Sequence, residues 1–379
     1  MPIKVTHVVR QYAPSIGGME DVVQNIARQQ LEQHGQIPTI LTLDRLFTKE
    51  EVFLPSEETI DGVRVIRIPY KGSSRYPVAP GVLKWLHEAD VVHVHGIDFF
   101  YDFLAWTKWL HRRPLVASTH GGFFHTEYAS SLKKVYFKTV TRASSLAYDR
   151  VVGTSNNDGD LFRAVVAKSK LSVIENGVNV EKYSNQSSLQ LKPVFIYFGR
   201  WSKNKGLSET IELFRSIVEI NRDWTLIIAG REYDYSQVDL KDLVTKAGLE
   251  NNIKIVPNPD QQQLASLIGQ ASYYICLSRH EGFGIAPIEA MSAGLIPILS
   301  DIPPFRQLIE QSGIGILLDI TQSANSLKKI NQLHEDGKLM HRIQRKASQD
   351  FVQRYSWRDI SGRYVDIYKK LASKAMFDA

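Results

Sequence analysis

Short runs of apolar and β-branched residues alternate with longer amphipathic stretches along most of the chain. In the first half these runs are residues 4–9, 39–43, 63–68, 91–95, 115–119, 151–153 and 171–174. Runs of this length predict buried strands, and the stretches between them predict helices. Such alternation favours a parallel sheet that is covered by helices on both faces.

The same pattern starts again after a polar, unpatterned segment at residues 184–192, which we interpret as a linker. The later apolar runs are residues 194–198, 225–229, 253–256, 273–277, 296–299 and 315–318. From Trp357 onward, apolar residues recur at spacings near three and four, which predicts a helix. We expect that helix to return to the first domain.

A chain of 379 residues is longer than the usual single core. We therefore predict an α/β protein with three parts. Residues 1–184 form a first Rossmann-like domain, residues 193–355 form a second, and residues 356–379 form the returning helix.

Composition places the chain among ordinary globular proteins, because 43% of its residues are hydrophobic and 23% are charged. The only cysteine is Cys276, so an intramolecular disulfide is excluded and a reducing compartment is favoured. We find no secretory signal at the N-terminus and no apolar run long enough to span a bilayer. We expect a cytoplasmic protein.

Positive charge gathers in residues 103–170, which hold eleven Lys or Arg against four Asp or Glu. Within this region Lys133, Lys134, Lys138 and Arg142 alternate with apolar residues in a helix-compatible pattern. A basic amphipathic helix of this kind fits an anionic membrane surface. It equally fits the solvated face of an ordinary surface helix.

Paired glycines, Gly17 and Gly18, follow the first predicted strand and precede an amphipathic helix. Glycine lets backbone N–H groups approach an anion closely, and the helix N-terminus adds partial positive charge. A phosphate site and a plain strand-to-helix turn both fit this segment. The GxGxxG fingerprint that is typical of nicotinamide enzymes is absent here.

Two cations, Arg200 and Lys205, follow the first strand of the second domain, at the sheet edge where α/β proteins bind ligands. Together they offer a planar fork and a mobile point charge for a diphosphate. The alternative is a pair of solvated loop cations.

The most specific segment runs from Glu281 to Glu289, with two carboxylates eight positions apart. Between them lie Gly282, Phe283, Gly284 and Ile285, at a predicted helix start. This arrangement lets Glu281 reach sugar hydroxyls and Glu289 reach a ribose diol, while free backbone amides face phosphate or sugar.

Histidines and aspartates elsewhere invite chemical interpretations. His120 ends an apolar strand and precedes two glycines, which favours a functional position. His93 and His95 share one strand face but have no carboxylate or cysteine nearby in sequence, so we interpret them as structural and predict no metal site. Asp158 and Asp160 are interpreted as a helix cap.

A cluster of aromatics borders strand ends of the first domain. Its members are Phe99, Phe100, Tyr101, Phe123, Phe124 and Tyr128. They fit a platform for acceptor sugars and fit core packing equally well.

The whole chain resembles the retaining glycosyltransferases of family 4, which have the GT-B fold of two Rossmann-like domains facing a cleft. The resemblance rests on Gly17-Gly18-Met19-Glu20, on Gly199-Arg200 followed by Lys205-Gly206, and on the ExxxxxxxE motif from Glu281 to Glu289. Residues 73–77, 95–102, 118–125 and 278–284 further resemble the bacterial α-mannosyltransferases of xanthan and acetan synthesis.

This resemblance implies a hexosyltransferase that moves α-mannose from GDP-mannose to a polyprenyl-diphosphate-linked cellobiose, with an α-1,3 linkage, at the inner face of the bacterial plasma membrane. It assigns His120 to the mannosyl ring, Arg200 and Lys205 to the diphosphate, Glu281 to the sugar hydroxyls and Glu289 to the ribose. Gly17 and Gly18 would line the phosphate. No metal or other cofactor is implied, because the protein supplies the cations.

Three other hypotheses stay open at this point. The chain could be a family 4 transferase with another nucleotide sugar or acceptor, or a non-catalytic protein that binds nucleotide sugars. A phosphorylase of the same fold would need a pyridoxal site, and 379 residues are few for one. Nothing in the sequence points to nucleic acid.

Overall fold

The computed structural model describes residues 2–74, 76–120, 135–281, 283–319 and 323–377. The chain divides into two compact units. The first unit comprises Met1–Gly177 together with Trp357–Ala379, and the second comprises Val178–Ser356. The second unit is thus inserted, in chain order, between two parts of the first.

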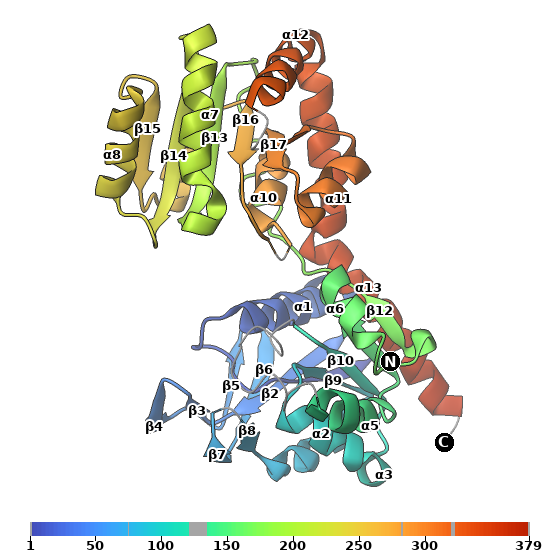
Figure 1. Cartoon of the computed structure of the whole chain (residues 1–379). Coiled ribbons are helices and arrows are strands. Elements are labelled where there is room, and N and C mark those ends of the chain that lie inside the picture. The colour runs from blue at the N-terminus through green and yellow to red at the C-terminus, as the bar shows by residue number, and fades with distance from the viewer. Residues whose placement is uncertain (1, 75, 121–134, 282, 320–322, 378–379) are drawn as a thin grey trace. The chain divides into compact units, whose positions relative to one another are not determined.

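The first unit is built on an eight-stranded sheet with the order β12-β11-β10-β9-β1-β2-β6-β5 (Figure 1). Its strands are β1 (Lys4–Val8), β2 (Ile37–Leu43), β5 (Glu57–Ile60), β6 (Val63–Ile68), β9 (Val91–His95), β10 (Leu115–Ser118), β11 (Arg150–Gly153) and β12 (Leu171–Val173). All neighbours pair in parallel except β5 with β6. Two hairpins stand outside this sheet, β3 (Arg45–Leu46) with β4 (Lys49–Phe53) and β7 (Lys71–Ser73) with β8 (Tyr76–Val78).

Helices cover both faces of the first sheet. They are α1 (Gly18–His34), η1 (Pro80–Glu88), α2 (Phe99–Trp106), α3 (Lys108–His111), η2 (Phe137–Thr141), α5 (Arg142–Ser145), α6 (Asn156–Phe162), η3 (Lys168–Lys170) and α13 (Trp357–Phe377). One apolar core joins the strands to α2, and others join them to α1 and α13. A parallel sheet needs such cover because its strands are apolar on both faces.

The helix α13 lies beside α1, although more than three hundred positions separate them in the sequence (Figure 1). Trp357, Ile360, Tyr364 and Tyr368 are buried in the core that also holds Val22 and Ile26 of α1. The predicted return of the C-terminal helix to the first domain is therefore confirmed.

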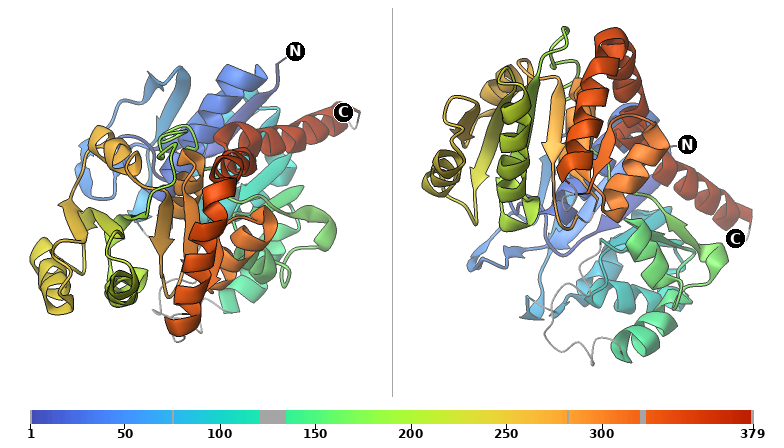
Figure 2. Two further views of the ribbon diagram at one scale, coloured as in Figure 1. Left: turned by 90° about the horizontal axis from the view of Figure 1, so that it is seen from above. Right: turned by 45° about the horizontal axis from the view of Figure 1, so that its top comes forward.

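The second unit holds a six-stranded, wholly parallel sheet with the order β15-β14-β13-β16-β17-β18. Its strands are β13 (Val194–Trp201), β14 (Thr225–Glu232), β15 (Ile253–Pro257), β16 (Tyr273–Cys276), β17 (Ile296–Ser300) and β18 (Ile316–Leu318). Its helices are η4 (Lys203–Lys205), α7 (Leu207–Ile220), α8 (Gln237–Ala247), α9 (Gln261–Ile268), α10 (Ile285–Ala293), α11 (Pro303–Ser312), α12 (Ser323–Val352) and η5 (Gln353–Tyr355). Among them, α7 lies between α8 and α12, which Figure 2 shows from two further directions.

The polar segment 184–192, which the sequence predicts to be a linker, packs against the second unit. The amides of Ser187 and Ser188 donate to the carbonyls of Ala293 and Ala271, at 2.9 and 3.1 Å. Arg345 Nε donates to Ser187 Oγ at 3.0 Å. These bonds satisfy the segment's polar groups locally, so the chain passes between the units at Gly177, before the predicted boundary.

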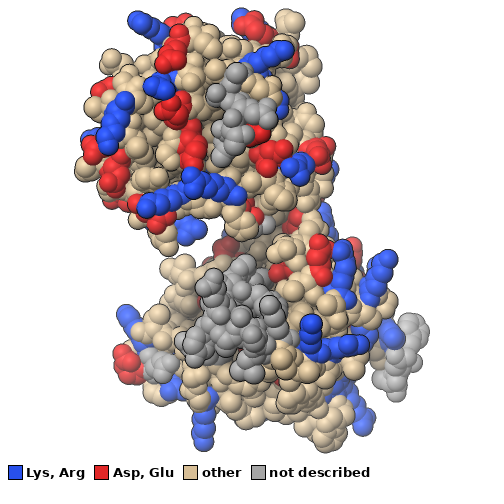
Figure 3. Space-filling model, viewed as in Figure 1, with Lys and Arg blue, Asp and Glu red and all other residues tan. Residues whose placement is uncertain are grey.

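Among the residues that the structure describes, no helix combines the length and the apolar character needed to cross a bilayer. On the face of the second unit seen in Figure 3, basic and acidic side chains are interspersed.

Candidate active site

The second sheet reverses its strand order between β13 and β16, and ligands of α/β proteins bind at such a point, beyond the carboxyl ends of the strands. A pocket lies there. Its lining residues come from both strands, from η4, from the loop that follows β16 and from the start of α10: Tyr197, Phe198, Gly199, Arg200, Lys205, Tyr274, Cys276, Glu281, Gly284, Ile285, Ala286 and Pro287.

Lys205 reaches this pocket because the turn that carries it lies directly against the β16 strand end. Gly206 has φ of 65°, and a Cβ atom there would stand 2.0 Å from the carbonyl oxygen of Leu277. No side chain fits at that distance, and the left-handed backbone also favours glycine. Gly206 thus allows the close approach that places Lys205 at the pocket.

Glu281 and Lys205 form an ion pair within the pocket lining. Lys205 Nζ lies 2.6 Å from Glu281 Oε1, and the Ser278 hydroxyl donates to the same oxygen, also at 2.6 Å. The two charged side chains are 20% and 13% exposed, so their ion pair is largely shielded from solvent. The structure therefore brings these two predicted residues together.

Arg200 also lines the pocket but is more exposed. Its guanidinium carbon lies 5.3 Å from the centre of the Tyr233 ring, within cation–π distance. The Tyr197 hydroxyl donates to the Arg200 carbonyl at 2.7 Å and so fixes the backbone beneath the cation. The sequence prediction assigned a role to neither tyrosine.

Glu289 lies in the second turn of α10, as predicted, and Gly284 is the residue before the helix. Burial raises the pKa of the Glu289 carboxyl, while Lys182, whose Nζ lies 3.6 Å away, acts in the opposite direction. The sequence prediction named Arg200 and Lys205 but missed Lys182, because Lys182 lies more than one hundred positions from Glu289 and in no motif.

The remaining residues of the predicted donor signature separate into different environments. Gly282 lies outside the described residues. Ile285 is 51% exposed at the start of α10 and lines the pocket. Phe283 packs edge-on against Tyr355, with 5.7 Å between ring centres. Through this contact Phe283 joins the apolar core of the second unit.

Gly17 and Gly18 stand at the N-terminus of α1, as predicted, with Gly17 as the residue before the helix. The Glu20 carboxylate folds back to this helix end, where it accepts a bond from Ser15 Oγ at 3.0 Å. A Cβ atom on Gly17 would stand 2.4 Å from Glu20 Oε2. A helix N-terminus attracts negative charge, and here a side chain of the protein supplies it.

His120 follows β10 in a left-handed backbone conformation, with φ of 51°. Its Nε2 lies 3.0 Å from His95 Nδ1, and burial lowers the pKa of its imidazole to about 4. Left-handed conformations are uncommon for residues other than glycine and are found often at functional sites.

The predicted basic segment is only partly described, because Lys133 and Lys134 lie outside the described residues. Lys138 and Arg142 are exposed, on η2 and at the start of α5, whereas Phe137, which directly precedes Lys138, is buried. This pattern provides an outward basic face on the first unit.

One smaller prediction from the sequence needs revision. The cap of α6 is Ser155, whose side chain accepts from the Asp158 amide. Asp158 instead lies inside the helix and accepts from the hydroxyls of Thr119 and Thr154, each at 3.0 Å. Phe99, Phe100 and Tyr101 are buried in the apolar core that joins the first sheet to α2, as the core-packing alternative expects. The other three aromatics of that cluster lie outside the described residues.

Family models match both halves of the chain. The model described as Glycosyltransferase Family 4 matches residues 16–182, and the model described as Glycosyl transferases group 1 matches residues 179–350.

Three relatives show how far this similarity extends. A GDP-mannose:cellobiosyl-diphosphopolyprenol alpha-mannosyltransferase from Xanthomonas campestris is 52% identical over 97% of this chain and 96% of its own. A protein of the same name from Komagataeibacter xylinus is 38% identical over 100% of this chain and 95% of its own. A phosphatidyl-myo-inositol mannosyltransferase from Mycobacterium leprae is 26% identical over 94% of each.

Solved structures agree on the fold. A glycosyltransferase from Rickettsia africae superimposes with a TM-score of 0.70 at 19% identity, over 98% of each chain. Anabaena HepE, solved in complex with UDP, gives 0.70 at 18% identity, over 97% of this chain and 100% of its own. The chain belongs to the family 4 glycosyltransferases of the GT-B fold.

Proposed function

We propose that this hexosyltransferase moves α-mannose from GDP-mannose to a cellobiose that is carried on a polyprenyl diphosphate, in exopolysaccharide biosynthesis. The observation that carries the proposal is the pocket at the β13/β16 strand ends, where Arg200, Lys205 and Glu281 converge. The names of the Xanthomonas and Komagataeibacter relatives supply the donor and the acceptor.

The proposal divides the donor among three residues of the pocket lining, Arg200, Lys205 and Glu281, and two residues outside it, Glu289 and His120. Arg200 and Lys205 hold the diphosphate, and charge that develops on it during departure strengthens both contacts. Glu289 receives the ribose diol. Glu281 receives sugar hydroxyls through Oε2, since its Oε1 already accepts from Lys205 and Ser278. His120 contacts the mannosyl ring.

Lys205 has two roles in this scheme. Its ion pair with Glu281 holds the ammonium at the pocket wall, so little side-chain entropy is lost when a diphosphate arrives. A diphosphate then becomes a second anionic partner for the same ammonium. Because the pair is largely shielded from solvent, this attraction is stronger than between exposed charges.

The transfer retains the α-configuration by displacement on one face of the sugar. The pocket lining holds one carboxylate, Glu281, which is already engaged with Lys205, so the proposal uses no protein nucleophile. The departing diphosphate takes the proton of the acceptor hydroxyl. No metal is required, because the two protein cations face the diphosphate.

The acceptor carries a long lipid, so we assign the protein to the cytoplasmic face of the bacterial plasma membrane as a peripheral protein. The exposed Lys138 and Arg142 support attraction to anionic lipid.

The decisive experiment incubates the protein with labelled GDP-mannose and a lipid fraction that contains polyprenyl-diphosphate cellobiose. We expect label in the lipid phase, release by α-mannosidase, an α-1,3 linkage, and unchanged activity with a chelator. Arg200→Ala should lower turnover by orders of magnitude with an unchanged circular dichroism spectrum. Arg215→Ala, which removes a surface cation of α7, is the matched control.

Parallel reactions with UDP-glucose and UDP-galactose test donor choice. Faster turnover with either sugar, or binding of GDP-mannose without any transfer, would contradict the proposal. Loss of activity with chelator would contradict the metal-free scheme alone.

A further inference from the structure

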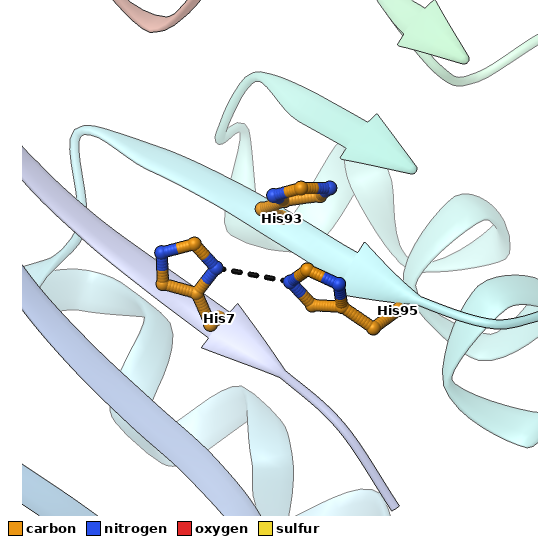
Figure 4. Close-up of side chains that lie close together, drawn as sticks. All are labelled: His7, His93 and His95. Atoms are coloured by element: carbon orange, nitrogen blue, oxygen red, sulfur yellow. Dashed lines mark hydrogen bonds between the residues drawn. The ribbon is translucent and has the colours of Figure 1, made fainter. Parts of the chain in front are cut away.

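Four histidines cluster in the first unit at the point where its strand order reverses, between β1 and β9. His7 lies on β1, His93 and His95 lie on β9, and His120 follows β10. Figure 4 shows the first three, with His7 and His95 joined by a hydrogen bond. His7, His93 and His95 are at most 1% exposed.

Three of these imidazoles form a continuous chain of hydrogen bonds. Gln30 Oε1 lies 2.6 Å from His7 Nε2, and His7 Nδ1 lies 3.0 Å from His95 Nε2. His95 Nδ1 then lies 3.0 Å from His120 Nε2. We call Gln30, His7, His95 and His120 the histidine relay.

The cluster has the spacing of a metal site, because ligand atoms of His7, His93 and His95 lie within 4.8 Å of one another. Every ring nitrogen of these residues nevertheless has a partner within the protein. His93 bonds to the hydroxyls of Tyr368 and Ser118, at 2.7 and 2.8 Å. A metal would have to displace these bonds, so hydrogen bonding accounts for the arrangement.

A neutral imidazole has one N–H and one lone pair, so each bond in the relay fixes the next. The Gln30 oxygen can only accept, and His7 must therefore donate from Nε2. His7 Nδ1 then accepts from the N–H at His95 Nε2. By the same rule, His95 Nδ1 accepts from the N–H at His120 Nε2. The last ring nitrogen in the series, His120 Nδ1, carries a lone pair.

The direction of the relay is set at its buried end. Gln30 Nε2 donates to Gln36 Oε1 at 2.9 Å, which turns the Gln30 oxygen toward His7. Burial lowers the pKa of His7 to about 4 and that of His95 well below its usual value. The relay is therefore uncharged at neutral pH, and no second proton on a ring disturbs the order.

We infer that Gln30, His7 and His95 are positioning residues that hold His120 as the Nε2–H tautomer, so that its Nδ1 accepts a hydrogen bond from a sugar hydroxyl. The sugar contact rests on the function proposed above, whereas the tautomer rests on the relay alone. His120 thereby acts as an acceptor toward the sugar, although a neutral histidine is equally able to donate.

The test measures the tautomer directly in the full-length protein. With 15N-histidine labelling, the two ring nitrogens of His120, assigned by comparison with His120→Asn, report which one carries the proton. We expect the proton on Nε2. A proton on Nδ1 would mean that both glutamine amides are turned over and that the relay runs in reverse, and this outcome would overturn the inference.

Gln30→Met removes the acceptor that sets the direction, and we expect His120 then to populate both tautomers. Tyr368→Phe is the matched control, because it removes a bond to His93 in the same buried cluster but leaves the relay intact. An unchanged His120 in Gln30→Met, or an equal change in Tyr368→Phe, refutes the role of Gln30. If Gln30→Met does not fold, His7→Phe interrupts the relay one step later.

Kinetics separate the two parts of the inference. Gln30→Met should raise the KM for GDP-mannose by about three- to tenfold, as expected when a neutral hydrogen bond is lost, and Tyr368→Phe should leave it unchanged. An unchanged KM in an active enzyme with mixed tautomers would overturn the contact with the sugar. Failure of GDP-mannose transfer in the wild type would instead overturn the proposed function and leave the tautomer measurement standing.

Discussion

The two sheets share one strand order around their points of reversal, yet they place opposite chemistry there. Beyond β13 and β16 the second unit has a pocket with an ion pair between Lys205 and Glu281. Between β1 and β9 the first unit has uncharged imidazoles joined to one another. The same topology therefore provides a charged edge in one unit and a neutral, hydrogen-bonded edge in the other.

The difference follows from what each edge faces. A charged pair is stable at the pocket because each charge has an opposite charge 2.6 Å away, and the Ser278 hydroxyl donates to the carboxylate as well. Imidazoles that are fully buried must stay neutral, because an imidazolium without water or a carboxylate partner is costly. The second unit is thus organised to meet charge, and the first is organised to fix the direction of hydrogen bonds.

Removing the charge at the pocket should have the largest effect. We expect Lys205→Ala to lower kcat by about 10²- to 10³-fold, the cost of losing one preorganised group that stabilises a developing anion. Steady-state kinetics with GDP-mannose measure it. Lys346→Ala, an exposed lysine of α12, should be neutral. A normal kcat in Lys205→Ala would contradict the claim that the second unit is organised to meet charge.

Acid should destabilise the first unit through its neutral histidines. Their folded-state pKa values are depressed, to about 4 for His7 and His120. The contribution of these neutral histidines to the free energy of unfolding is therefore fully present above pH 6.5 and is lost as pH falls toward 4. Each such histidine costs about 2 kcal/mol between pH 6.5 and 5. Buried Asp98, whose pKa is raised to about 6, acts in the opposite direction and offsets part of this loss.

Hydrogen exchange at pH 7 and pH 5 locates this loss. Amides of β1, β9 and β10 should lose protection, while those of β13 and β14 should change less. Equal loss in both sheets would show that the buried imidazoles do not govern acid stability.

Glu289 connects activity and stability in the second unit. Because burial raises its folded-state pKa, its favourable contribution to stability is present at low pH and is lost as pH rises through that pKa. Glu289→Gln should therefore raise Tm at pH 7.5, with a smaller gain at pH 4.5. The same variant should raise the KM for GDP-mannose about tenfold, through loss of a charged hydrogen bond. A lower Tm at pH 7.5 would contradict this account.

The smallest effect concerns the basic face of the first unit. Lys138→Ala should weaken binding to vesicles that contain anionic lipid by about 1 kcal/mol, or about fivefold. Co-sedimentation measures it, and Lys241→Ala on α8 of the second unit is the control. If both lysines matter equally, charge attraction is not specific to the first unit.

The sequence predicted the parallel strands and placed Lys205 and Glu281 beyond strand ends, because both depend on local patterns. The apolar runs mark every parallel strand, and Lys205 and Glu281 lie in motifs that follow strand ends. Neither the Lys182 contact with Glu289 nor the histidine relay has such a signal. His7 and His95 are 88 positions apart, and only the register of β1 beside β9 brings them together.

The predicted boundary failed for a related reason. A polar, unpatterned segment is typical of a linker, but Ser187 bonds to Ala293 of α10 and to Arg345, and Ser188 bonds to Ala271. Sequence spacing does not reveal these partners. Asp158 likewise has the sequence position of a cap, but its carboxylate accepts a hydrogen bond from the buried hydroxyl of Thr119, a partner 39 positions away.

The return of α13 to the first unit has a consequence for synthesis on the ribosome. Domains generally fold as units while the chain emerges, with the N-terminal one first. Here the first unit lacks Trp357, Tyr364 and Tyr368 of its core until the whole second unit has been made. The unit that starts the chain is thus the one that finishes last, and until then its apolar surface beside α1 lacks the cover that α13 provides.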